Sequence, residues 1–103
     1  MRYENRMYAI AIVRYRRPLE EVLKQIDPHR AYLRELQKQG RLLVSGPLDP
    51  RHGGALLLRV SEENPLAELD RIRDGDPFVT NGLAQYELLP WLPNIGLEGL
   101  EKL

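Results

Sequence analysis

The segment Met7–Val13, with the sequence MYAIAIV, is apolar at every position and is followed directly by Arg14. A short, continuous apolar run of this kind is typical of a strand whose two faces are both covered. We therefore expect Met7–Val13 to be a central strand of a β-sheet, and the elements on its C-terminal side are interpreted around it.

Three further segments have the composition of strands. Arg41–Ser45 (RLLVS) stops at Gly46-Pro47, and Ala55–Val60 (ALLLRV) follows a loop rich in turn residues. Ala84–Leu88 alternates between apolar and polar residues, which is typical of a strand with one exposed face. From Pro90 onward, prolines and glycines predict an extended tail.

Apolar residues recur at the helical period between the first two predicted strands. Pro18–Ile26 is expected to form one short helix, with proline in its first position. A second helix of about three turns is then expected, with Asp27 as N-cap, Pro28 at the first position and Gly40 after its C-terminal end.

The segment before the last strand also has a helical pattern. Pro65 begins a helix that Asp74–Asp76 breaks, and Pro77–Asn81 is expected to form one further turn capped by Asp76. The predicted order of strands and helices is βαββαβ. This order predicts an α+β, ferredoxin-like fold with a four-stranded antiparallel sheet and both helices on one face.

The sheet face opposite the helices is expected to be apolar. Tyr8, Ile10 and Ile12 alternate with the residues that face the helices, and a bare apolar face of several hundred Å² usually marks an interface. We therefore expect a homodimer, with Trp91 and the tail crossing between subunits. The alternative is a monomer whose tail folds across its own sheet.

Composition limits the classes of function. The 103 residues fit one domain of residues 1–103, with a core of residues 7–91 and a C-terminal tail of residues 92–103. Fifteen Lys and Arg balance fifteen Asp and Glu, so nucleic-acid and membrane partners are not expected. The absence of cysteine excludes disulfides and cysteine-ligated zinc, and with two histidines we expect no metal and no cofactor. The expected location is the cytoplasm.

Two residues are candidates for acid/base chemistry. His29 precedes Tyr32, Leu33 and Leu36 by three, four and seven positions, which places it on the inward stripe of its helix. There it is either a general base or a histidine that satisfies local polar groups. Asp76 is expected to be an N-cap, and such a carboxylate can also orient a nearby imidazole.

Several neighbours are candidates for substrate binding. Ser45, Gly46 and Pro47 end a strand where backbone can approach a ligand, and Phe78 supplies an apolar wall. Tyr32 is expected in the core or at an interface, or at a cleft beside His29. The second histidine, His52, lies in a polar glycine-rich loop and is expected to face solvent.

Taken together, these motifs resemble the YciI-like (YCII-related) family. The resemblance covers Met7 to Trp91, and the order and spacing of the motifs make it specific. The matching stretches are Asp27–Leu33 (DPHRAYL), Gly40–Leu48 (GRLLVSGPL), Gly53-Gly54 with the strand that follows, Asp76–Phe78 (DPF), Gly82-Leu83, and Tyr86–Leu88 through Pro90-Trp91.

The resemblance implies a dimeric ferredoxin-like fold with an active site built around a histidine and an aspartate. By motif position these residues are His29 and Asp76, with Ser45, Gly46 and Pro47 nearby. A related dehydrochlorinase acts on a chlorinated hydroxyquinol, and muconolactone isomerases share the general fold.

Residues and resemblance together predict a cofactor-independent enzyme, an isomerase or a lyase of the dehydrochlorinase type, acting on a small organic acid or phenol. His29 would be the general acid/base and Asp76 would hold its tautomer. The alternative is a non-catalytic dimer that binds a metabolite or a partner protein. A small oxygenase of the same general fold ranks last.

Overall fold

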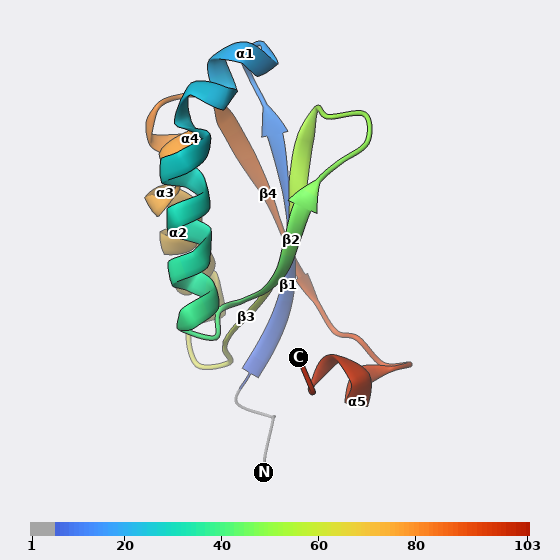
Figure 1. The fold of residues 1–103 in the computed structure, drawn as a ribbon. Coiled ribbons are helices and arrows are strands. Elements are labelled where there is room, and N and C mark those ends of the chain that lie inside the picture. The colour runs from blue at the N-terminus through green and yellow to red at the C-terminus, as the bar shows by residue number, and fades with distance from the viewer. Residues whose placement is uncertain (1–5) are drawn as a thin grey trace.

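The computed structural model describes residues 6–103 and has the predicted βαββαβ architecture (Figure 1). The strands are β1 (Arg6–Tyr15), β2 (Leu42–Pro47), β3 (Gly53–Ser61) and β4 (Ala84–Trp91). The helices are α1 (Leu19–Val22), the 3₁₀ helix η1 (Leu23–Gln25), α2 (Ile26–Lys38), α3 (Pro65–Gly75), α4 (Pro77–Thr80) and α5 (Leu97–Leu100).

The four strands form one antiparallel sheet in the order β2-β3-β1-β4. Strand β1 pairs with both β3 and β4, and Ile10 lies between Leu57 on one side and Leu89 on the other. The prediction that Met7–Val13 is a central strand is therefore confirmed, as is the α+β ferredoxin-like fold. Helices α2 and α3 cover one face of this sheet (Figure 1).

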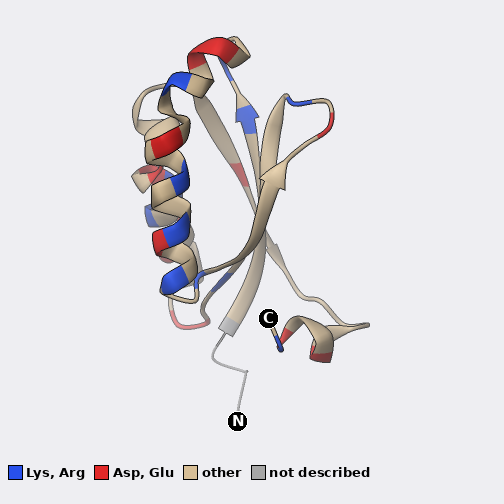
Figure 2. Cartoon of the chain, in the orientation of Figure 1, with Lys and Arg blue, Asp and Glu red and all other residues tan. Residues whose placement is uncertain are grey.

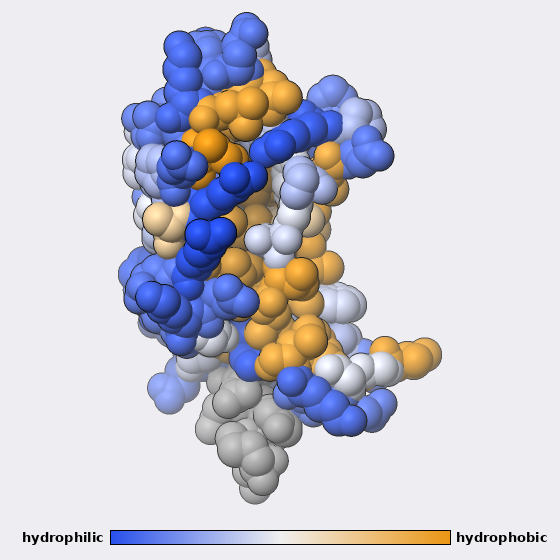
Figure 3. All heavy atoms as spheres, in the orientation of Figure 1, coloured by the Kyte–Doolittle hydropathy of each residue, from blue (hydrophilic) through white to orange (hydrophobic). Residues whose placement is uncertain are grey.

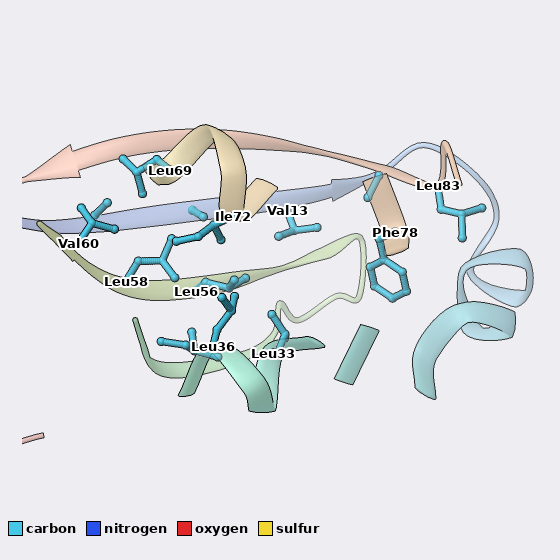
Figure 4. Close-up of a cluster of buried hydrophobic side chains, with 14 of the residues drawn as sticks. Val13, Leu33, Leu36, Leu56, Leu58, Val60, Leu69, Ile72, Phe78 and Leu83 are labelled. Carbon is cyan, nitrogen blue, oxygen red and sulfur yellow. The ribbon is translucent and has the colours of Figure 1, made fainter. Parts of the chain in front are cut away.

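The core lies between this sheet face and the helices (Figure 4). Alternate residues of β1 and β3 point toward the helices, and two leucines of α2 and two apolar residues of α3 meet them. Burial of one such large side chain stabilises a fold by about 1.5–3 kcal/mol. The residues that make this contact are Ala9, Ala11, Val13, Leu56, Leu58, Val60, Leu33, Leu36, Leu69 and Ile72.

The start of α2 differs from the prediction. The helix begins at Ile26, so Asp27 lies inside the first turn and is not the N-cap. The reason is that η1 carries the chain into α2 without an extended residue, and Gln25 takes the cap position with no side-chain cap. The carboxylate of Asp27 still lies near the positive end of the helix dipole. Gly40, with φ of +77°, follows the C-terminal end as predicted.

The strands extend further than their patterns predicted, and the tail is not extended throughout. Strand β2 continues through Gly46-Pro47 and β4 continues through Pro90 to Trp91. Both are edge strands, where a proline is tolerated because its missing backbone N–H can lie on the side without a neighbouring strand. In the tail, Gly96 adopts a φ of +87° and the short helix α5 follows it.

The opposite sheet face is apolar over part of its length, and the Arg14–Glu87 salt bridge lies at its other end. Charged residues lie mostly on the helices and loops, and few lie on the strands (Figure 2). On this face Leu89 and Trp91 are 41% and 40% exposed, whereas Tyr8 is buried with the Arg59 guanidinium 5.6 Å from its ring centre. Within residues 6–103, no helix has the length and apolar character that crossing a membrane requires.

Candidate active site

The fold brings His29 and Asp76 into direct contact across 47 positions of sequence. Nδ1 of the imidazole lies 2.8 Å from Oδ1 and 3.0 Å from Oδ2 of the carboxylate. His29 belongs to the first turn of α2, and Asp76 joins α3 to α4. Both side chains are buried in a region that also holds the core.

Local sequence fixes the position of Asp76. The residue is the N-cap of α4, where Oδ1 accepts a hydrogen bond of 2.9 Å from the backbone N–H of Phe78. Pro77 occupies the first helical position, where its fixed φ favours the start of a helix. The predicted cap is confirmed, and the same carboxylate also binds the imidazole.

The Asp76 carboxylate is fully buried and has three donors. In addition to His29 and the Phe78 amide, the Tyr86 hydroxyl donates to Oδ2 over 2.5 Å. A buried carboxylate is costly unless such partners replace water. Burial, followed by the charge of Asp76 and this hydrogen bond, raises the pKa of Tyr86 far above its usual value. Tyr86 therefore remains a protonated donor throughout the ordinary pH range.

This hydrogen-bond pattern assigns the tautomer of His29. Because the oxygens of Asp76 act as acceptors, Nδ1 of the imidazole carries the proton and Nε2 carries the lone pair. The ring also stacks on Phe78, with 3.8 Å between ring centres and 4° between planes. The stacking thus fixes the orientation of the ring plane, and the hydrogen bond to Asp76 fixes the tautomer.

A hollow of about 200 Å³ lies beside this pair. Its walls come from β1, β3, α2, the end of β2 and the loop that follows β2. His29 and Phe78 form part of the wall, and among the residues that the structure describes no carboxylate belongs to the lining. The other lining residues are Val13, Tyr15, Ile26, Arg30, Leu33, Ser45, Gly46, Pro47, Arg51, Gly54, Ala55 and Leu56.

The residues expected at a cleft separate into two groups. Ser45, Gly46, Pro47 and Phe78 line the hollow together with His29. Tyr32 does not, because its hydroxyl donates to the Ile72 carbonyl over 2.7 Å and so ties α2 to α3. Burial, followed by the charge of Asp76, raises the pKa of this hydroxyl.

The close approach of Tyr32 to α3 explains one glycine. A Cβ added at Gly75 would lie 2.6 Å from the Tyr32 hydroxyl oxygen, which is too close for any side chain. This contact gives Tyr32 a structural place in the fold, away from the hollow. His52 is exposed on the loop between β2 and β3.

Sequence patterns did not identify Tyr86, Tyr15, Arg30 or Arg51 as site residues. Alternation along β4 placed Tyr86 on the apolar face of the strand, but it gave no sign that Asp76 is its partner. Arg51 belongs to the loop between β2 and β3, which reaches the site only because the sheet brings that loop beside β1. Within residues 6–103 no cluster of three or more His, Asp or Glu side chains has the arrangement of a metal site.

We expect the Tyr86→Phe substitution to lower the free energy of unfolding by about 1–3 kcal/mol, because it removes one of the three donors to a buried carboxylate. Urea denaturation would measure this loss. Tyr8→Phe is the matched control, since among residues 6–103 no group accepts a hydrogen bond from the buried Tyr8 hydroxyl. Equal losses in the two variants would contradict the proposed role of Tyr86.

Comparison with known proteins agrees with this architecture. The family model of the YCII-related domain matches residues 7–92. Among solved structures, the chain is similar to 5-chloro-2-hydroxyhydroquinone dehydrochlorinase from Burkholderia phenoliruptrix AC1100, determined in complex with 2,5-dihydroxybenzoquinone. The TM-score is 0.66 at 24% identity, over 84% of this chain and 96% of that chain, which shows a shared fold. No curated protein sequence matches. The chain belongs to the YCII-related family.

Proposed function

We propose that this protein is a small enzyme that transfers protons on a small organic acid or phenol, with His29 as the general acid/base. The observation that carries the proposal is the hydrogen bond between His29 and the buried Asp76, located beside a hollow that His29 itself lines. A buried titratable pair at the wall of a small pocket is a typical arrangement for acid/base catalysis.

Each residue of the pair has a separate role. Nε2 of His29 takes a proton from the substrate, and positive charge then develops on the imidazole. Asp76, with oxygens 2.8 and 3.0 Å from Nδ1, stabilises that charge and keeps the ring in the required tautomer. The stacked Phe78 ring keeps Nε2 directed at one place. Proton transfer by a positioned side chain contributes about 10²–10⁴ in rate.

Dehydrochlorination of a chlorinated hydroxyquinol is one reaction that such a group can perform. One hydroxyl proton moves through His29 to the carbon that bears chlorine, and a second hydroxyl proton is lost to solvent. Chloride leaves with the electron pair of the C–Cl bond. The ring becomes a quinone and the balance requires no external oxidant. Isomerisation uses the same base to return a proton at a different carbon.

The fold shared with a dehydrochlorinase favours the lyase over the isomerase. The second candidate function is a non-catalytic dimer that binds a metabolite or a partner protein, in which His29 only donates or accepts a hydrogen bond. The two functions differ in turnover, because a binding protein retains its ligand unchanged.

Chloride release from 5-chloro-2-hydroxyhydroquinone tests this choice. The His29→Ala substitution should lower the rate by about 10²–10⁴, because it removes the acid/base group. His52→Ala is the matched control and should leave the rate unchanged, since His52 is exposed and is not among the residues that line the hollow.

An unchanged rate in the His29→Ala variant would contradict the role of His29 as the general acid/base. Binding of the compound by the wild-type protein without any release of chloride would favour the non-catalytic function. Calorimetric titration of the same compound supplies the binding measurement.

We further propose that the protein is a homodimer that buries the sheet face opposite α2 and α3. Leu89 and Trp91 are exposed on this face, although both are large apolar side chains. A second copy would cover these apolar side chains by a symmetric contact.

Replacing Leu89 by Lys should shift the protein from twice the chain mass of 11.9 kDa toward the single mass, because each dimer would bury two ammonium groups. Light scattering after size-exclusion chromatography measures this mass. Leu66→Lys is the control, since Leu66 is 64% exposed on α3, on the other side of the molecule. A wild-type protein that elutes as a monomer would contradict the proposed dimer.

A further inference from the structure

Two arginines line the hollow beside His29, and no carboxylate from residues 6–103 does. Arg30 follows His29 on α2, and Arg51 comes from the loop between β2 and β3. We propose that the site selects a single-ring compound that carries a negatively charged oxygen, and that Arg51 is the residue that binds this oxygen. The proposal rests on the proposed function, because it names the substrate class of the same site.

A series of contacts connects Arg51 with the imidazole. Nε of Arg51 lies 3.5 Å from the Tyr15 hydroxyl oxygen, to which it donates. The Tyr15 ring packs edge-on against Phe78 with 5.9 Å between centres, and Phe78 stacks on His29. The Tyr15 and Phe78 rings therefore connect Arg51, which would bind the charged group, with His29, which would transfer the proton.

Neither arginine of the hollow forms a salt bridge with a residue in the described part of the chain. Among residues 6–103, the arginines that form salt bridges are Arg14 with Glu87 and Arg73 with Asp70 and Asp74. Two guanidinium groups at a partly enclosed hollow create a positive potential that attracts an anion. The planar guanidinium also presents paired N–H donors that match a carboxylate.

The surface view agrees with this arrangement. In Figure 3 hydrophilic side chains extend between α2 and the loop that follows β2, with apolar atoms exposed on either side of them. The residues of this region that line the hollow and carry charge are Arg30 and Arg51.

The size and the wall of the hollow limit the rest of the ligand. A cavity of about 150 Å³ accepts benzene, so a hollow of about 200 Å³ has room for one ring with small substituents. Val13, Leu33 and Leu56 supply apolar surface for such a ring. The ligand class that fits is a cyclic or aromatic carboxylate, or a ring with an ionised hydroxyl.

Benzoate and benzamide form a matched pair of probes, because they have nearly the same shape and differ in charge. Titration of each into the wild-type protein, followed by two-dimensional NMR, should show benzoate binding at least tenfold more tightly, with shifts at His29. The preference should shrink as salt is added, since screening weakens exposed charges. Titration with 2,5-dihydroxybenzoquinone, an acidic hydroxyquinone, separates a preference for ionised hydroxyl groups from one for carboxylates.

Arg51→Gln should remove most of the preference for benzoate while benzamide binding changes by less than threefold. Arg51→Lys should retain part of the preference, because it keeps the charge but loses the paired donors. Arg71→Gln is the control, since Arg71 is exposed on α3 and does not line the hollow. The same NMR spectra report whether each variant is folded.

Three results would overturn the proposal: equal affinity of the wild-type protein for both probes, binding of neither probe, or a preference that persists in Arg51→Gln. These equilibrium measurements are independent of turnover. A preference for benzoate without enzymatic activity would support the anion site and contradict the proposed enzymatic function. Enzymatic activity without a preference for benzoate would support the enzymatic function and contradict the anion site.

Discussion

The hydrogen bonds of the Asp76 carboxylate are the contacts on which the rest of the site depends. A fully buried carboxylate needs donors, and this one has a backbone amide, a phenol and an imidazole. These donors come from three separate elements, α4, β4 and α2. The same group therefore caps a helix, joins the helices to an edge strand and determines which nitrogen of His29 is free.

This arrangement explains how a short chain builds a precise site. The core between sheet and helices surrounds the Asp76 carboxylate and shields it from water, so its hydrogen bonds are electrostatically stronger than they would be in water. Phe78 belongs to that core and also stacks on the imidazole, so the same side chain contributes to the core and positions His29. The imidazole lines a hollow whose charged wall comes from α2 and from the loop between β2 and β3. A loop is the part of a fold that varies most easily.

Much of the fold follows from local patterns. The apolar run of β1 predicted its central position, the helical stripe placed His29 inward, and Asp76-Pro77 predicted a helix start. Local rules failed where two signals competed. Asp27-Pro28 has the same cap pattern as Asp76-Pro77, but η1 leads directly into α2 and leaves the Asp27 cap unused.

The site was predictable only in part, because its partners meet through tertiary packing. Because 47 positions separate His29 from Asp76, local patterns could not predict their contact. The family resemblance was what supported it. The hydrogen bond from Tyr86 depends on the placement of β4 beside β1, and the position of Arg51 depends on the pairing of β2 with β3. Tyr32 satisfied the same helical pattern as His29, but its hydroxyl donates a hydrogen bond to the Ile72 carbonyl and does not reach the hollow.

The central claim is that the buried carboxylate holds the imidazole with its proton on Nδ1. Nitrogen-15 NMR of the His29 ring, recorded at a pH where the ring is neutral, tests this claim most directly. The structure predicts a protonated Nδ1 and an unprotonated Nε2. A ring with its proton on Nε2 would contradict this assignment.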